Sequence, residues 1–156
     1  IEEKKENLSN TFNALLEMGI IPIVNENDSV SYTEIESKDR LFGDNDMLSA
    51  VVAVLCRAGR LVIFSDIDGF YDNDPRLYEN ARLIKRIDRI DDELLSLAGG
   101  AGSRRGTGGM RTKLRAARLA AANGIETVIT NGSNPAALYD ITDGKEVGTL
   151  FAAAPV

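Results

Sequence analysis

The apolar positions of this chain alternate between helical spacing and short continuous runs. Near the start, Leu8, Phe12 and Leu15 recur at helical spacing within residues 2–17, and Gly19 follows as a stop signal. Similar patterns predict further helices over 47–58, 91–97, 110–123 and 135–139. Continuous apolar runs predict strands over 20–24, 61–64, 83–87, 127–130 and 147–151. Alternating helices and strands are typical of an α/β fold, and we expect a three-layer αβα sandwich with a mainly parallel sheet.

Two stretches lack this periodicity. Residues 29–42 are polar and charged, and residues 99–109 are rich in glycine. We interpret the first as a loop or a short hairpin, and a loop of that length is often functional. The first helix is already under way at Ile1, so we expect residues 1–156 to be one domain that is truncated at its N-terminus.

Composition removes several classes of function. The 156 residues include no histidine and one cysteine, Cys56, which excludes Ser-His-Asp and Cys-His catalysis and leaves almost no transition-metal site. The net charge of −6 argues against sequence-independent binding to nucleic acid. No apolar run reaches the roughly 18 residues of a membrane span, and no signal peptide is visible, so we expect a cytoplasmic protein without membrane contact. This composition is compatible with phosphoryl transfer, because that chemistry relies on Lys, Arg, Mg²⁺ and backbone N–H groups.

Polar clusters follow three of the predicted strands. They are residues 25–28, 65–68 and 131–133. In open parallel sheets, ligands bind beyond the carboxyl ends of the strands, which places Asp28 and Asp66 on one functional edge. The alternative is that both aspartates only cap turns, and topology alone leaves it open.

Residues 106–113, Gly-Thr-Gly-Gly-Met-Arg-Thr-Lys, are suited to binding an anion. Closely spaced glycines let backbone N–H groups approach a phosphate, and the helix that follows adds the positive end of its dipole. The spacing is neither a Walker A motif nor a Rossmann fingerprint. On a helical projection Lys113 lies apart from the arginines at 111, 115 and 118, and of these Arg115 and Arg118 fit a solvated face.

A second constellation, residues 43–46, precedes the nearly uncharged helix over 47–58. Its sequence is Gly-Asp-Asn-Asp. One such side chain caps a helix, with about 1 kcal/mol of stabilisation, but three in a row favour a ligand or a lysine partner as well.

These stretches together resemble the amino acid kinase family, and within it the members that phosphorylate the side-chain carboxylate of L-glutamate. The stretches that match, in the family's order, are residues 21–28, 43–50, 65–71 with 74–76, 106–113 and 147–151. The resemblance implies the family's αβα fold and an activity that uses ATP and Mg²⁺. It also implies a homo-oligomer, a dimer or a tetramer.

The resemblance also implies roles for individual residues. Asp28 and Asn45 match positions that hold glutamate, and Asp46 matches an aspartate that orients catalytic lysines. Ser65 and Asp66 match a nucleotide-binding pair. The ATP-binding loop of the family matches Thr107, Gly108, Gly109, Met110, Arg111, Thr112 and Lys113, with Lys113 stabilising the transferring phosphoryl group. Residues 29–42 match a loop linked to feedback inhibition by proline.

This sequence also departs from the family. We expect residues 1–156 to lack the N-terminal half of the family's kinase domain, with its glycine-containing phosphate loop and second catalytic lysine, and to lack the nucleic-acid-type accessory domain that follows the kinase domain in many members. We therefore expect the isolated chain to be inactive. Two alternatives remain, a sibling kinase acting on N-acetylglutamate, aspartate, carbamate or UMP, and a non-catalytic domain that senses a ligand such as proline.

Overall fold

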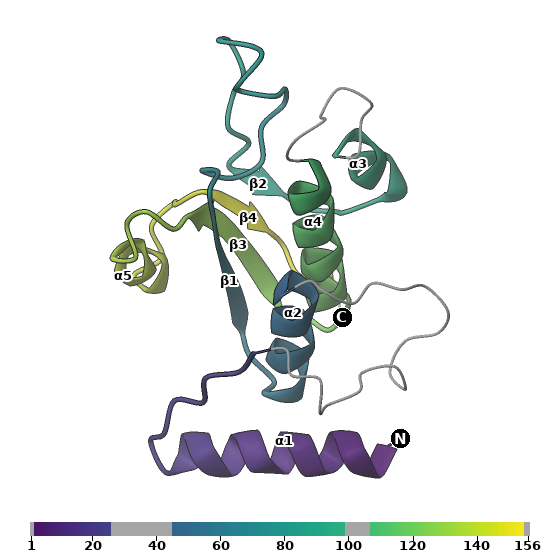
Figure 1. Ribbon diagram of the computed structural model, residues 1–156, viewed down its shortest axis with the longest axis vertical. Helices are drawn as coiled ribbons and strands as arrows, with labels where there is room; N and C mark the ends of the chain where they lie inside the picture. Colours follow the sequence, from purple (N-terminus) through teal and green to yellow (C-terminus); the bar gives the residue numbers. More distant parts are fainter. Residues whose placement is uncertain (1, 26–44, 99–106, 155–156) are drawn as a thin grey trace.

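The computed structural model describes residues 2–25, 45–98 and 107–154. Its helices are α1 (Glu2–Glu17), α2 (Asn45–Leu55), α3 (Asp92–Leu97), α4 (Thr107–Ala122) and α5 (Ala137–Thr142). Its strands are β1 (Arg60–Ser65), β2 (Arg86–Ile87), β3 (Glu126–Asn131) and β4 (Thr149–Phe151). Figure 1 shows α1 set apart at one end of the molecule, beyond α2. Within the described ranges, no helix has the length and apolar character needed to cross a membrane.

The four strands form one sheet in the order β1-β3-β4-β2. β1 pairs with β3 in parallel, β2 pairs with β4 in parallel, and β3 pairs with β4 in the antiparallel sense. The register places Ser65 opposite Asn131, so the last residues of β1 and β3 are neighbours. The polar residues that follow these two strands therefore start from the same edge of the sheet.

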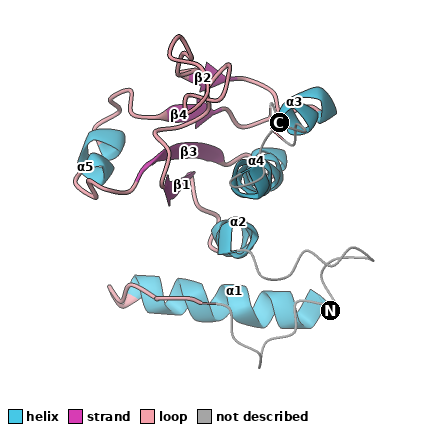
Figure 2. Cartoon of the chain, turned by 45° about the horizontal axis from the view of Figure 1, so that its top comes forward, coloured by secondary structure: helices cyan, strands magenta, loops and turns pink. Residues whose placement is uncertain are grey.

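Helices pack on both sides of this sheet. α4 packs against β1 and β3, while α2 packs against α4 and β1. Their shared core contains fully buried Ala50, Leu114 and Ile129. Figure 2 shows α5 on the opposite side of the sheet from α4. Val128 and Ile141 are buried outside the main core, which is consistent with a thinner second layer under α5. The expected α/β architecture, with a sheet that is parallel in two of its three pairings, is confirmed.

The predicted strand over 20–24 is wrong for the described structure. Residues 20–25 have no regular secondary structure, and Ile21 and Ile23 are 85% and 97% exposed. A strand needs a neighbour to pair its N–H and C=O groups, and across residues 2–25, 45–98 and 107–154 no strand pairs with this segment. The apolar pattern was therefore an insufficient signal without a partner strand.

The ends of other elements also differ from the predictions. α4 begins at Thr107, three residues before the predicted start, so Gly108 and Gly109 are helical. Glycine lowers the stability of a helix interior. In the first turn of a helix the N–H groups have no hydrogen-bond partner within the helix, so less helical hydrogen bonding depends on the residues there. The predicted strand over 83–87 shrinks to β2, two residues long.

Candidate functional site

An ion pair joins the beginning of α2 to α4. The ammonium nitrogen Nζ of Lys113 lies 3.0 Å from Oδ2 of Asp46. Each side chain is only 15% exposed. The hydroxyl Oγ1 of Thr112 lies 3.0 Å from the same carboxylate oxygen. Three side chains from two helices thus meet at one carboxylate, in a position largely shielded from water.

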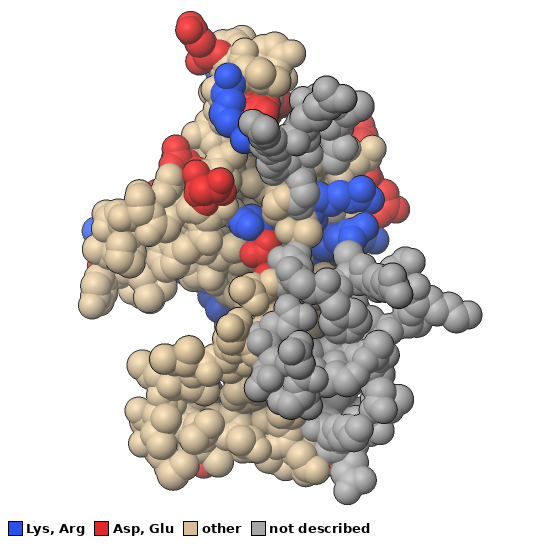
Figure 3. Space-filling model, viewed as in Figure 1, with Lys and Arg blue, Asp and Glu red and all other residues tan. Residues whose placement is uncertain are grey.

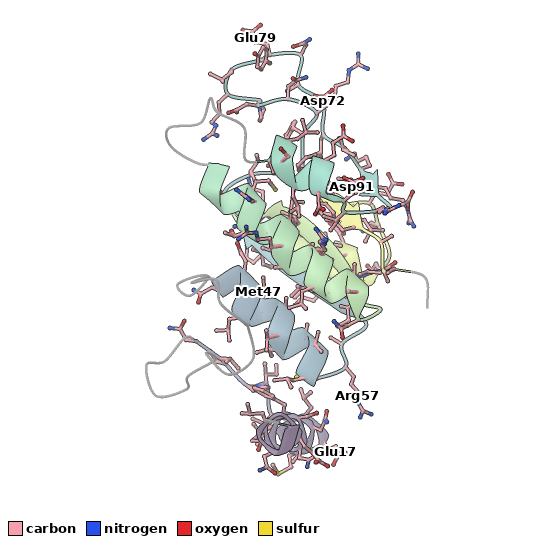
Figure 4. The ribbon with its side chains drawn as sticks, turned by 90° about the vertical axis from the view of Figure 1, so that its right-hand side faces the viewer. Glu17, Met47, Arg57, Asp72, Glu79 and Asp91 are labelled. Carbon is pink, nitrogen blue, oxygen red and sulfur yellow. The ribbon has the colours of Figure 1, made fainter. Side chains whose placement is uncertain are left out.

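The local sequence explains why these side chains meet. Asp46 lies in the first turn of α2, where a negative charge is favoured by the positive end of the helix dipole. Leu114 of α4 is completely buried, and this anchors the adjacent Lys113 toward α2. In Figure 4, Met47 marks the start of α2 and Arg57 lies just past its end, and α4 runs beside it in the same direction. The predicted separation of Lys113 from the arginine flank, and the predicted lysine partner for residues 43–46, agree with this geometry.

The geometry leaves Lys113 able to bind a second anion. A lysine ammonium group has three N–H donors, and Asp46 accepts one. The remaining donors can bond to phosphate oxygens. The carboxylate also holds the flexible lysine in one orientation, which is what a group that stabilises developing charge requires.

The loop that follows β1 forms the second part of the site. The hydroxyl of Ser65, at the end of β1, donates to Oδ1 of Asp66 over 3.1 Å. Arg76 bonds to Asp74 over 3.1 Å, and this hydrogen bond raises the pKa of the Arg76 guanidinium, with the charge of nearby Asp66 adding to the shift. The same contact holds the pKa of the Asp74 carboxyl below its usual 3.8. Arg76 and Asp74 thus form an exposed ion pair in the loop that follows β1.

The remaining predicted site residues lie partly in α2 and α4 and partly outside the described residues. Asn45 is exposed at the first position of α2, next to Asp46. Asp28 and the predicted loop over 29–42 lie outside the described residues. The predicted ATP-binding loop is helical from Thr107 onward, which corrects its assignment as a loop. Met110 is partly buried and packs against the core. Gly109 and Arg111 are exposed in the first part of α4.

The arginines of α4 fit the predicted solvated face. Arg118 pairs with Asp92 of α3 at 2.6 Å, with 49% and 90% of the side chains exposed. Figure 3 shows Lys and Arg side chains gathered beside α4. An exposed pair of this kind contributes little to stability.

Sequence reasoning did not assign a role to Asp68 or Asn131, although both lie in polar clusters that it noted. The amide Nδ2 of Asn131 donates to Oδ1 of Asp68 over 2.8 Å. Asp68 follows β1, and Asn131 is the last residue of β3, the parallel neighbour of β1, so the shared edge of the sheet was the available signal.

Known proteins resemble both the sequence and the fold. Residues 2–131 match the model of the amino acid kinase family. The chain belongs to the amino acid kinase family. This agrees with the resemblance seen in the motifs.

Curated relatives within this family are similar over most of the chain. A glutamate 5-kinase from Clostridium perfringens is 55% identical over 152 residues, which cover 97% of this chain and 56% of that protein. One from Listeria welshimeri is 51% identical over 148 residues, which cover 95% of this chain and 53% of that protein. This amino acid kinase chain spans about half the length of the curated relatives it matches.

Solved structures of the family have the same fold. A UMP kinase from Bacillus anthracis has a TM-score of 0.54 at 17% identity, covering 73% of this chain and 42% of its own. An isopentenyl phosphate kinase from T. acidophilum has a TM-score of 0.53 at 21% identity, covering 94% of this chain and 66% of its own. At these identities the likeness concerns the fold alone.

Proposed function

We propose that this chain is the nucleotide-binding part of an ATP-dependent kinase that phosphorylates the side-chain carboxylate of L-glutamate. The observation that supports the proposal most directly is the Asp46–Lys113 pair, 3.0 Å long and shielded from water. The glutamate 5-kinases that match almost the whole chain support the choice of acceptor. In the proposed reaction a carboxylate oxygen of glutamate attacks the γ-phosphorus, the bond to the β,γ-bridging oxygen breaks, and glutamyl 5-phosphate and ADP result.

Charge is the main obstacle to this reaction, because both reactants are anions. A carboxyl group with a pKa near 4.3 is ionised at neutral pH, so no general base is needed. Lys113 would donate hydrogen bonds to oxygens of the transferring phosphoryl group while Asp46 holds its ammonium group in place. Backbone N–H groups of the first turn of α4 would bind phosphate oxygens, aided by the helix dipole. Ser65 and Asp66 would contact the nucleotide beyond the end of β1.

Mg²⁺ bound with ATP would neutralise part of the phosphate charge. In sites of this kind the ion takes many of its ligands from phosphate oxygens and water. Within the described ranges, no three His, Cys, Asp or Glu side chains are grouped as a metal site. Asp66, exposed at the carboxyl edge of the sheet, is a carboxylate that could contribute one ligand. The residues present therefore fit a metal that arrives with the nucleotide.

Other parts of the proposal concern residues beside the pair. Asn45 would bind the glutamate substrate, since it precedes Asp46 at the start of α2. Asp28 has the same proposed role, and inhibition by proline is proposed for residues 29–42. Assembly into a dimer or a tetramer and a cytoplasmic location likewise stay predictions.

A chimaera tests the proposed function in the setting of a complete enzyme. In it, this chain replaces the 152 matched residues of the Clostridium perfringens glutamate 5-kinase. We expect glutamate-dependent release of ADP from the chimaera, and a loss of at least about 100-fold in kcat in Lys113→Met, in line with the removal of one preorganised charge-stabilising donor. Arg118→Met, on the exposed flank of α4, is the matched control and should retain activity.

Assays with other acceptors separate the alternatives. If the chimaera turns over faster with N-acetylglutamate, aspartate, carbamate or UMP than with glutamate, then that compound, and not glutamate, is the acceptor. A folded chimaera that binds proline but not Mg-ATP would favour the ligand-sensing alternative. Full activity in Lys113→Met would contradict the role of the Asp46–Lys113 pair. The 156-residue chain alone should bind Mg-ATP without turning over.

A further inference from the structure

A chain of hydrogen bonds connects the loop after β1 to the loop after β3. Nδ2 of Asn131 donates to Oδ1 of Asp68 over 2.8 Å. The hydroxyl of Tyr71 donates to Oδ2 of Asp68 over 3.1 Å. The backbone N–H of Ser133 donates to Oδ1 of Asn131 over 2.9 Å. Both oxygens of the Asp68 carboxylate, and both polar atoms of the Asn131 amide, therefore have defined partners.

This network lies beside the loop assigned to the nucleotide. Asp68 is two residues beyond Asp66, and Asn131 is opposite Ser65 in the register of the sheet. The backbone N–H of Gly132 also donates to the carbonyl of Ser65 over 2.8 Å. The Ser65–Asp68 turn is thus held at its first residue by a backbone bond and at its last residue by a side-chain bond, both from the end of β3.

Tyr71 adds a third point of attachment from farther along the chain. Burial raises the pKa of the Tyr71 phenol, and its hydrogen bond to the Asp68 carboxylate adds to the shift. The backbone N–H of Phe70, the next residue back, donates to the Thr149 hydroxyl over 2.8 Å. The segment that leaves the turn is therefore fixed to β4 as well.

We propose that Asp68 and Asn131 are positioning residues. They hold Ser65 and Asp66, within the Ser65–Asp68 turn, in the orientation that binds the nucleotide. This role depends on the nucleotide site proposed above. Neither residue is assigned contact with the substrate. They act by fixing the backbone of the turn, through the hydrogen bond between the Asn131 amide and the Asp68 carboxylate.

A reciprocal exchange of the two side chains provides the sharpest test. In Asp68→Asn the amide oxygen at position 68 can still accept from Asn131, so the hydrogen bond remains but loses its charge, whereas in Asn131→Asp two carboxylates face each other across the same short distance. In the double variant, the amide introduced at position 68 can donate to the carboxylate introduced at position 131 and accept from the Tyr71 hydroxyl. That carboxylate still accepts from the N–H of Ser133. Net charge and every hydrogen bond are preserved.

The measurement is the Kd of the 156-residue chain for Mg-ATP by calorimetry, with urea unfolding of each variant to establish that it is folded. We expect Asn131→Asp to raise the Kd about 5- to 10-fold, the effect of losing one hydrogen bond to a charged group at an exposed site, and Asp68→Asn to raise it less, because a neutral hydrogen bond remains. The double variant should return to within about twofold of the wild type. Ser133→Ala keeps the backbone N–H and should bind like the wild type.

Three outcomes would overturn the assignment. If the wild type binds Mg-ATP and both folded single variants bind it equally well, the network has only a structural role. If the folded double variant binds Mg-ATP as weakly as Asn131→Asp, the pairing of the two side chains does not control nucleotide binding. If the wild type does not bind Mg-ATP at all, the proposed nucleotide site fails, and the positioning role fails with it.

Discussion

Burial, rather than distance, should decide how much an ion pair stabilises this protein. Asp46–Lys113 and Arg118–Asp92 provide the comparison. The first pair is longer, at 3.0 Å, with both side chains 15% exposed, and the second is 2.6 Å long, with side chains 49% and 90% exposed. A double-mutant cycle measures the coupling in each pair, with Asp46→Asn and Lys113→Met in one cycle and Asp92→Asn and Arg118→Met in the other.

The expected magnitude follows from the surroundings of each pair. Two unit charges 3.0 Å apart attract by roughly 5 to 6 kcal/mol at an effective dielectric constant near 20, and solvent that reaches the exposed part of each side chain reduces this attraction. We expect a coupling of about 1.5 to 2 kcal/mol for Asp46–Lys113. Exposed pairs typically reach about 0.2–1 kcal/mol, so we expect about 0.5 kcal/mol or less for Arg118–Asp92.

Urea unfolding at two salt concentrations is the assay. The coupling of the exposed pair should fall toward zero in about 1 M salt, where the Debye length is about 3 Å, and that of the shielded pair should mostly persist. A coupling in Asp46–Lys113 that is no larger than that in Arg118–Asp92, or that is lost equally in salt, would contradict the role given to burial.

Two further predictions concern stability, and urea unfolding measures both. Gly148→Ala should lower the free energy of unfolding by at least about 3 kcal/mol, because φ is +62° there and a Cβ would lie 2.1 Å from the carbonyl oxygen of Ile129. Gly144→Ala is the control: φ is +78° there but no atom lies within 4 Å of the added Cβ, so the loss should be only about 1 kcal/mol. Equal losses at the two glycines would contradict this. Thr127→Val should be neutral or stabilise by up to about 1 kcal/mol, since the buried hydroxyl has no partner among the described residues. Thr149→Val should cost about 2 kcal/mol, because its hydroxyl bonds to the N–H of Phe70 and the carbonyl of Ile84. A loss at Thr127 as large as that at Thr149 would show that the Thr127 hydroxyl is satisfied.

The order of helices and strands was largely predictable from the sequence, because it depends on local periodicity. The helical spacing over 110–123 predicted α4, and Leu114 is completely buried in it. The run over 61–64 predicted β1 to within one residue at each end. The segment over 20–24 shows the limit of this reasoning, since an apolar run becomes a strand only where another strand can accept its hydrogen bonds.

For the candidate site, too, the sequence revealed one part and only the tertiary structure revealed the other. Its residue types, a lysine after glycines and aspartates after strands, were visible in the sequence because phosphate chemistry restricts the choice of side chains. The contact between Asp46 and Lys113 joins residues 67 positions apart, and that between Asp68 and Asn131 joins residues 63 positions apart. Only the packing of α2 on α4, and the parallel pairing of β1 with β3, brought these side chains together. Periodicity is a property of neighbours along the chain, whereas a site depends on which elements share an edge, and that is decided by the tertiary fold.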